Sequence, residues 1–511
     1  MTTRQRLTIV ATGLGMFMVF LDALIVNVAL PDIQSEFGVG EAGAQAVVTS
    51  YSVGMAVTIM WSATLADLRG RRRVYLGAAT VFCSASLLCG ISSNFTILVI
   101  GRTIQGLAAG PITVASLALL SAAFADDKMR TRAVGLWTAV GTIGTAIAPT
   151  IGGVLVDEVG WRSIFFVNLP IGVLLVALTL AFVSESSDPS DRTFDYGGQV
   201  FFGVAIATFA AGVIAAPRAG WLSFQVLSLF AVAAVSIVVF IGRERRADDP
   251  MMDLGLFVNR VYSMALSTLF VLFFVGYGVL LIVTQFFQNV RGFSAMKAGL
   301  LILPFALGMM FMAPFAGRIC ERIGRRTAIL IALGTMVGGL LILGVGLSVE
   351  PWIVSLGLFV IALANSLAVV PLTGLSMSSV TPDKSGMASG IMGTQRAIGS
   401  TTGYAVMGSV LAVWVGANLD DELVGTVSDA SEREAISSAI VDQANPSAFV
   451  AELGPGQPEG VAAPSEQAEI LSIADDVFVT GMQVSLAVAI GLVVATLITA
   501  KFVLPREQPA A

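Results

Sequence analysis

The sequence has no histidine, only three cysteines and few charged residues. Of its 511 residues, 12% are charged and 56% are hydrophobic, whereas soluble domains carry about a quarter charged residues. This composition excludes a water-soluble globular protein. The cysteines, Cys83, Cys89 and Cys320, lie in or beside apolar stretches without metal-ligand spacing. Because histidine is also lacking, the sequence predicts no zinc, haem or other metal site.

Apolar stretches of about 20 residues, enough to cross a bilayer, recur along the chain. We predict fourteen transmembrane helices, in groups of six, two and six. Their expected ranges are 7–30, 45–66, 74–93, 96–122, 133–156, 164–183, 199–216, 222–242, 261–286, 297–317, 327–347, 352–378, 386–415 and 478–503. The first stretch lacks a signal-peptide cleavage site, so we expect it to be retained as a span.

The basic residues are concentrated in alternate predicted loops. Of the 28 Lys and Arg residues, 21 lie at the termini and in the even-numbered loops. Cytoplasmic loops of membrane proteins carry the excess of positive charge, so both termini are expected in the cytoplasm. Arg outnumbers Lys 24 to 4, which is typical of a GC-rich bacterium and indicates the bacterial plasma membrane.

The predicted helices define three regions. Residues 1–190 are expected to form a six-helix bundle, residues 191–250 an inserted pair of helices, and residues 251–511 a second six-helix bundle. Within the second bundle, the stretch at about 416–476 carries thirteen acidic residues and one basic residue. This stretch is expected to form a loop outside the cytoplasm.

Two short patterns recur about 254 residues apart. An acidic residue, a glycine and paired arginines occur first as Asp67, Gly70, Arg71 and Arg72, and again as Glu321, Gly324, Arg325 and Arg326. Gly144 and Ala148 likewise match Gly399 and Gly403. The two six-helix blocks are therefore interpreted as parallel repeats, an organisation that transporters use to build a site at the repeat interface.

Four stretches resemble motifs of the major facilitator superfamily, and within it of the fourteen-helix drug:proton antiporters. They are Leu21–Pro31, Ala63–Arg72, Leu98–Ala109 and Gly144–Gly153, and they are supported by Trp161–Gly172 and Gln285–Pro304. The chain departs from these motifs at Leu24, Ala63, Leu68 and Ala148, where the family usually has Thr, Gly, a basic residue and Gly. The resemblance implies an all-α polytopic fold of two six-helix bundles plus two inserted helices, and proton-driven export without a cofactor.

Asp22 is the candidate group for proton coupling. With no histidine, the proton carrier must be a carboxylate inside a span, and the other acidic residues lie at span ends or in loops. Arg102 enters the fourth span to a similar depth, roughly 9 Å against 12 Å at 1.5 Å per residue. We therefore predict an ion pair that opens when Asp22 is protonated. The alternative is a permanent pair that only fixes helix packing.

The repeated turn and the fifth span carry two further candidate elements. The resemblance implies a conformational latch at the first turn, with a counterpart in the second half formed by Glu321, Arg322, Gly324 and Arg325. A positive cluster that only orients the chain is the alternative. In the fifth span, the family motif implies an antiporter helix, and its candidate residues are Gly144, Pro149, Gly152 and Gly153. These glycines permit close helix approach and the proline a kink, although packing alone would also explain them.

Polar and aromatic residues inside other spans are candidates for a substrate cavity. They are Asn27, Tyr51, Tyr277, Gln285, Gln288, Asn365 and Arg396. The alternative for each is a polar contact between helices. For Arg396 it is a side chain that reaches towards the membrane surface or bonds to backbone carbonyls.

These features favour export of amphipathic drug-like compounds, cationic or neutral, by alternating access. A dedicated exporter of one metabolite, lipid or self-made antibiotic would use the same fold. An enzyme is disfavoured because no set of nucleophile, base and metal ligands converges, and a channel because no filter or charged ring is visible. The expected partners are a small-molecule substrate, protons and the lipid bilayer, without nucleic acid, and the protein is expected to act as a monomer.

Overall fold

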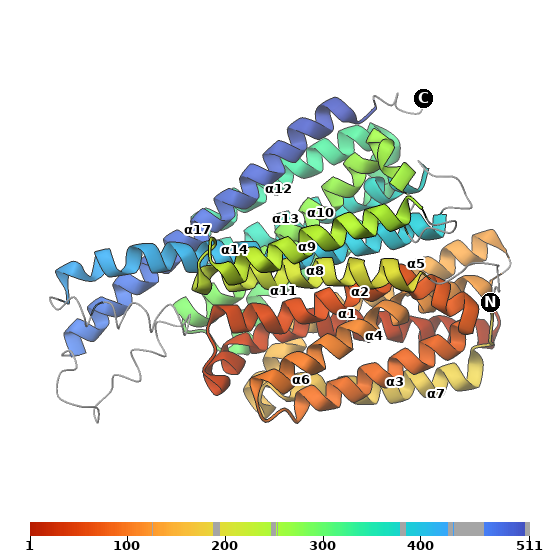
Figure 1. Ribbon diagram of the computed structural model, residues 1–511, viewed down its shortest axis with the longest axis horizontal. Coiled ribbons are helices and arrows are strands. Elements are labelled where there is room, and N and C mark those ends of the chain that lie inside the picture. The colour runs from red at the N-terminus through yellow and green to blue at the C-terminus, as the bar shows by residue number, and fades with distance from the viewer. Residues whose placement is uncertain are drawn as a thin grey trace.

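The computed structural model consists of long helices that run side by side (Figure 1). It describes residues 1–124, 126–187, 195–246, 252, 254–378, 385–427, 433 and 464–505, and this part of the chain contains helices and connecting turns but no strand. The N-terminus and the C-terminal end of the last helix, α17 (Pro464–Val503), lie at the same end of the helices (Figure 1). Apart from the groups at its two ends, the backbone hydrogen bonds of a helix are internal, which is the arrangement that a lipid environment demands.

The first block is formed by seven helical segments. They are α1 (Thr3–Phe37), α2 (Glu41–Arg69), α3 (Arg71–Gly90), α4 (Phe95–Ala122), α5 (Asp127–Val159), α6 (Ser163–Phe166) and α7 (Asn168–Phe182). The sixth predicted span is therefore broken in two at Val167. Pro170 explains the break, because proline has no N–H and its ring collides with the carbonyl four residues earlier.

The inserted pair and the second block follow. They comprise α8 (Tyr196–Ala219), α9 (Phe224–Glu244), η1 (Leu254–Val258), α10 (Arg260–Gln285), the π-helix η2 (Phe286–Val290), α11 (Ala295–Ile323), α12 (Arg325–Ser348), α13 (Pro351–Ser378), α14 (Ser385–Glu422), η4 (Leu423–Gly425) and α17 (Pro464–Val503). The acidic stretch at 416–476 was expected to be a loop, and this is wrong at both its ends: α14 continues to Glu422 and α17 begins at Pro464. Most of the remainder, 428–432 and 434–463, lies outside the described residues.

Twelve helical segments in the described part of the chain are long and apolar enough to cross a membrane. The chain is therefore a multi-pass membrane protein. Helices α2 and α5 are not among the twelve, but α2 packs along α4 and α5 along α1, which both are. Fourteen crossings remain a prediction.

The two blocks pack their helices in the same pairs. In the first block α1 lies on α5 and α2 on α4, and in the second block the corresponding pairs are α10 with α14 and α11 with α13. Contacts between the blocks are symmetric as well, because α2 packs on α14 while α5 packs on α11. We call these the two seams. The helix pairing thus follows the repeat that the sequence indicates.

The inserted pair covers one of the two seams. Helix α8 packs against both α2 and α14 (Figure 1). The Gln199 side chain of α8 donates a hydrogen bond to the Val57 carbonyl of α2. On α14, the Ser409 hydroxyl donates to the Val213 carbonyl of α8 at 3.2 Å. The pair therefore contacts both halves of the molecule along the α2–α14 seam.

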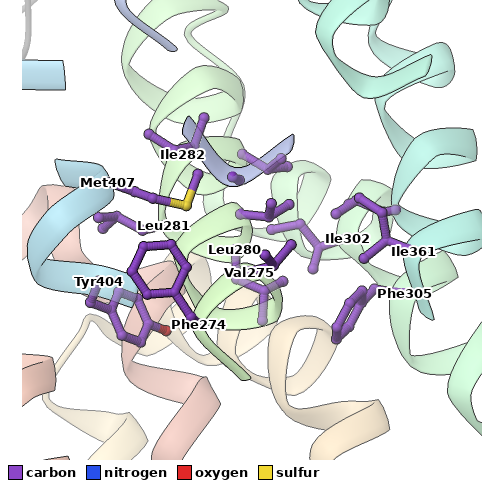
Figure 2. Packing of buried hydrophobic residues seen from close by; sticks show 14 of the residues in the cluster. Phe274, Val275, Leu280, Leu281, Ile282, Ile302, Phe305, Ile361, Tyr404 and Met407 are labelled. Carbon is purple, nitrogen blue, oxygen red and sulfur yellow. The ribbon is translucent and has the colours of Figure 1, made fainter. Parts of the chain in front are cut away.

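The core of the second block is almost wholly apolar. Figure 2 shows Val275 and Leu280 of α10 near Ile302 and Phe305 of α11, all buried. On the other side of α10, Tyr404 and Met407 of α14 belong to the same cluster. Inside a bilayer, close van der Waals packing rather than exclusion of water holds such helices together.

Candidate functional site

Asp22 of α1 and Arg102 of α4 form an ion pair inside the first block. Both side chains are 0% exposed, and Arg102 Nη1 lies 2.5 Å from Asp22 Oδ2. The matched depths in the sequence predicted this contact, and the structure confirms it. Taking two charges out of water is costly unless each gains further polar partners, so the surroundings of the pair decide whether it can exist.

The second carboxylate oxygen of Asp22 has two amide donors. Asn168 Nδ2 donates to Asp22 Oδ1 at 2.7 Å, and Gln105 Nε2 donates to the same atom at 3.1 Å. Both amides also donate to the Ser86 hydroxyl, which in turn donates to the Phe165 carbonyl. Every partner of Asp22 is thus a donor, which is the arrangement that suits a charged, acceptor-only carboxylate.

Arg102 is held from its other side by Tyr51. The guanidinium carbon lies 4.4 Å from the centre of the Tyr51 ring, and the Nε donates to the Val47 carbonyl at 3.3 Å. The Tyr51 hydroxyl donates to the Val19 carbonyl. Tyr51 was predicted to line the substrate cavity, and the structure places it against Arg102. Arg102 Nη2 is buried and has no hydrogen-bond partner among the described residues.

Three members of this network were missed in the sequence. Gln105 belongs to the fourth-helix motif and Asn168 to the stretch Trp161–Gly172, but neither was assigned a role. Ser86 carried no signal beyond being polar in an apolar span. Asn168 reaches Asp22 because the chain breaks between α6 and α7, so the first residue of α7 points into the block. Cys89 Sγ lies 3.5 Å from Gln105 Oε1 at the edge of the same network.

The first repeated turn joins α2 to α3 at Gly70. Its φ of 96° is a conformation that glycine adopts readily and other residues rarely do. Asp67 and Arg71 form an ion pair at 2.8 Å beside it. The Glu185 carboxylate, which follows α7, accepts hydrogen bonds from the backbone N–H groups of Arg72 and Arg73 at the start of α3. Glu185 was missed because it lies 113 residues from its partner.

The second turn, between α11 and α12, repeats this geometry at Gly324, whose φ is 82°. Arg72 donates to the Leu180 carbonyl at the end of α7, and Arg326 donates to the Lys501 carbonyl at the end of α17. The second arginine of each turn therefore binds the last helix of its own half. Glu321 and Arg322 lie in the last turn of α11 and Arg325 begins α12, on either side of Gly324. The latch role of both turns stays a prediction.

The glycines of α5 allow close contact with two different helices. A side chain at Gly144 would meet the Phe17 carbonyl of α1 at 2.6 Å, and one at Gly152 would meet Ile25 at 2.8 Å. Gly153 faces α11, where a side chain would lie 2.6 Å from the Ala295 carbonyl, and Gly299 of α11 packs against Pro149 in return. The predicted antiporter helix thus forms one of the two seams between the halves.

Asp157, one turn beyond Gly153, adds hydrogen bonds to the contact between α5 and α11. Its carboxylate accepts hydrogen bonds from the backbone N–H groups of Ala295 at 3.1 Å and Met296 at 2.9 Å. Ser294 accepts from the N–H of Lys297. The three free N–H groups at the start of α11 are therefore all bonded, two of them by the opposite half. Nearby, hydrogen bonding to Glu36 raises the pKa of Arg162.

Asn27, one of the predicted cavity residues, connects the halves near the centre. Tyr404 of α14 donates a hydrogen bond to Asn27 Oδ1 at 2.8 Å. Asn27 also lines a small hollow between α1, α5, α10 and α11, with room for about one water molecule. Tyr404 packs edge-on against Tyr277, with ring centres 5.8 Å apart. Tyr404 was missed because nothing in the sequence separates it from other aromatic residues.

The remaining cavity candidates lie on the second block. Gln288 donates to the Val28 carbonyl of α1, and Asn365 donates to the Leu272 carbonyl of α10. Both are polar contacts between helices, which is the alternative given above to a place in the substrate cavity. Gln285 is buried at the end of α10. Arg396 lies over the Phe273 ring, with its guanidinium carbon 4.7 Å from the ring centre.

Two blocks of helices with matching helix pairs, joined at two seams and holding a buried ion pair, are the organisation of a membrane transporter built from repeats. The chain belongs to the Major Facilitator Superfamily, whose family model matches residues 12–404. The match covers the ion pair, both turns and the antiporter helix. At the level of the family, the protein is a membrane transporter.

Three relatives resemble the chain over nearly its full length. The multidrug resistance protein Stp of Mycobacterium tuberculosis is 47% identical over 489 residues, which are 96% of this chain and 90% of Stp. The drug efflux pump JefA of the same species is 40% identical over 505 residues, 99% of this chain and 98% of JefA. The tetracenomycin C resistance and export protein of Streptomyces glaucescens is 29% identical over 94% of this chain and 88% of its own.

Solved structures show the same fold. A bacterial homologue of the human lysosomal transporter Spinster, in an inward-facing and occupied conformation, aligns over 100% of both chains with a TM-score of 0.65 and 16% identity. A D-xylose-proton symporter aligns over 79% of this chain and 89% of its own, with a TM-score of 0.58 and 16% identity.

Proposed function

We propose that this protein exports amphipathic drug-like compounds across the bacterial plasma membrane in exchange for protons. The observation that carries the proposal is the buried Asp22–Arg102 pair in a chain whose full-length relatives are named as a multidrug resistance protein and a drug efflux pump. The positive charge in alternate loops favours cytoplasmic termini. The proton gradient supplies the energy, so the proposal needs no cofactor.

Protonation of Asp22 is the coupling step in this proposal. A proton on the carboxylate removes the charge that holds Arg102 and leaves a buried guanidinium with fewer acceptors. The free energy of that buried charge then favours a rearrangement of α1 against α4, because an uncompensated ion in hydrocarbon is costly. Loss of the proton on the other side of the membrane restores the pair. A permanent pair would instead keep both helices fixed throughout the cycle.

Asn168 is placed to respond to the proton. A protonated Asp22 has an O–H group to donate, whereas all of its described partners now donate to it. The Asn168 Oδ1 is buried and has no hydrogen-bond partner among the described residues. Rotation of this amide would present Oδ1 to the new O–H. Because Asn168 begins α7 at the break, the rotation is linked to the connection between α6 and α7.

The test compares wild type with Asp22→Asn in reconstituted vesicles. We expect Asp22→Asn to lose substrate accumulation driven by an imposed pH difference, and to lose substrate-induced proton release, since the amide cannot carry a proton. Exchange of substrate at equal concentrations on both sides should persist, which separates coupling from folding. Glu350→Gln, which changes an exposed acid between α12 and α13, is the matched control. Accumulation by Asp22→Asn against a substrate gradient contradicts the proposal.

The breadth of the substrate range needs a second assay. A multidrug exporter should protect growing cells against several chemically unrelated toxic compounds, and loss of Asp22 should remove all of the protection together. Protection against a single chemical class would identify a dedicated exporter instead. The names of Stp and JefA, a multidrug resistance protein and a drug efflux pump, support the broader range.

A further inference from the structure

Arg396 of α14 is a charged group inside a span without a charged partner in the described chain. None of the ion pairs among the described residues includes it. Its Nε is buried and has no hydrogen-bond partner in that part of the chain. A guanidinium carries five N–H donors in a planar fork, and donors left unbonded in a low-dielectric interior are costly. Such a guanidinium can donate hydrogen bonds to an acceptor on a bound molecule.

One aromatic ring lies beside Arg396, and two further rings continue from it. Phe273 is under its guanidinium, Tyr277 lies against Phe273 with ring centres 6.4 Å apart, and Tyr404 lies against Tyr277. We call Phe273, Tyr277 and Tyr404 the aromatic shelf. Phe273 and Tyr277 are one helical turn apart on α10, and both are only partly buried. Phe273 and Tyr277 therefore retain accessible ring surface next to an unbonded cationic donor, whereas Tyr404 is fully buried.

The aromatic shelf faces the first half of the transporter. Tyr404 donates its hydrogen bond to Asn27 of α1. Tyr277 lies against Tyr404, and Asn27 follows Asp22 by five residues on the same helix, α1. Arg396 and the proton site thus lie on opposite sides of the same interface between the halves. This interface is where transporters built from repeats bind their substrates.

The charges at this interface disfavour a cation. Asp22 is the acidic residue at this depth in the described chain, and its two oxygens already accept from Arg102, Gln105 and Asn168. Its charge is balanced by Arg102, so Arg396 leaves a net positive charge. A cationic substrate would meet this charge with no free carboxylate to bind, whereas an oxygen acceptor would find the Arg396 donors.

We infer that the substrates are aromatic compounds without positive charge that place a carbonyl or phenolic oxygen on Arg396 and a ring on the aromatic shelf. This inference rests on the proposed export function and narrows its substrate class. It replaces the sequence-based expectation that includes cations. An uncharged substrate also leaves Asp22 free to exchange its proton without competing for a counter-ion.

A matched pair of dyes tests the inference in vesicles with an imposed pH difference. Rhodamine 123 and fluorescein methyl ester share a xanthene skeleton and a methyl ester, but the first is a cation and the second carries oxygen acceptors in place of the nitrogen groups. We expect kcat/KM for fluorescein methyl ester to exceed that for rhodamine 123 by about tenfold or more, the value of one hydrogen bond to a charged group. Equal or preferential transport of rhodamine 123 overturns the inference.

Variants of Arg396 identify the group responsible. Arg396→Gln should lower kcat/KM for fluorescein methyl ester by about tenfold and leave that for rhodamine 123 unchanged or higher, while Arg396→Lys should fall between. Arg245→Gln removes the same charge from an exposed position after α9 and should change neither dye. A monodisperse elution profile and intact Asp22-dependent proton release establish that each variant is folded.

The outcomes separate this inference from the proposed function. Equal loss of both dyes in Arg396→Gln, or loss of neither, overturns the inference while proton-driven export stands. If the transport rates of both dyes do not depend on the pH difference, in wild type and in Asp22→Asn, the proposed function is overturned and the inference with it.

Discussion

The two halves of the transporter share a framework but differ in charge at their centres. Gly144 of α5 packs on the Phe17 carbonyl, and Gly399 of α14 packs on the Phe270 carbonyl. Gly54 packs on the Thr103 carbonyl of α4, and Gly308 packs on the Phe359 carbonyl of α13. These matched contacts align the first and fourth helices of each half residue by residue.

The alignment shows what replaces the ion pair in the second half. Asp22 lies five residues after Phe17, and Val275 lies five after Phe270. Arg102 precedes Thr103, and Leu358 precedes Phe359. Val275 and Leu358 are both 0% exposed, and Val275 lies in the apolar cluster of Figure 2.

The comparison indicates that the fold itself does not need the ion pair. The same helix crossing is packed with Val and Leu in one half and with Asp and Arg in the other. A buried ion pair is weak evidence for stability, because well-packed apolar residues of similar volume are often as stable or more so. The charges of the first half are therefore best explained by function.

The largest expected effect comes from giving the first half the residues of the second. Arg102→Leu alone leaves Asp22 as an unpaired buried charge and should lower the free energy of unfolding by about 3–5 kcal/mol. The double variant Asp22→Val with Arg102→Leu should recover most of this loss, because no buried charge remains. Denaturant unfolding in detergent measures both values, and vesicle transport should be abolished in both.

A double variant as unstable as Arg102→Leu would contradict the equivalence of the two halves, and retained proton-driven transport would contradict the role of the pair.

Leu358→Ala supplies the matched measurement in the second half. It should cost about 2–5 kcal/mol through the cavity it leaves, and this loss should not change with pH. The loss in Arg102→Leu should shrink as the pH falls, since protonation of Asp22 removes the unpaired charge.

The second prediction concerns the seams, where the halves also differ. Asp157 of α5 bonds the start of α11, but the matching position on α14, 255 residues later, is Ala412, and the start of α2 has no side-chain cap. Asp157→Ala should therefore loosen only the α5–α11 seam, by about 0.5–2 kcal/mol, as for loss of a helix cap. Amide hydrogen exchange at Ala295 and Met296 should rise by about tenfold, since 1.4 kcal/mol is one power of ten.

Glu158→Ala, at the neighbouring exposed position, is the control for this seam and should leave the exchange rates unchanged. Faster exchange at the start of α2 in Asp157→Ala would show that the two seams open together. Unchanged exchange at Ala295 would mean that the carboxylate does not hold the seam in the membrane.

The smallest expected effect is at the repeated turns, where the halves agree. Arg72→Gln and Arg326→Gln each remove a hydrogen bond to the last helix of their half, so each should lower the free energy of unfolding by about 0.5–1.5 kcal/mol. The two losses should match within error in thermal unfolding. A much larger loss of transport for Arg72→Gln than for Arg326→Gln, at equal stability, would assign the latch to the first turn alone.

Local patterns in the sequence predicted the helices, the repeat and the family. Apolar runs gave the position of each long helix, and the glycines at 70 and 324 gave both turns, because span length and positive φ depend on residues close in sequence. The ion pair was also predictable, since a lone acid and a lone arginine at matched depth in hydrocarbon have few other partners.

Contacts that join distant segments were not predictable. Asn168 reaches Asp22 across 146 residues and Asp157 reaches Met296 across 139, and Tyr404 reaches Asn27 across 377. From its neighbours in the sequence, each of these residues would be interpreted as a helix start, a helix end or an aromatic residue on the apolar face of a helix. Only the packing of the helices gives them a partner.

By itself, the sequence determined that the chain is a membrane protein of repeated halves with one candidate proton carrier, because bilayer thickness, charge placement and the cost of buried charge act on short segments. The tertiary structure decided which donors saturate Asp22, that Arg396 lies over Phe273 without a charged partner in the described chain, and which seam the inserted pair covers. Those features arise from helix packing, which brings together side chains that no local pattern relates.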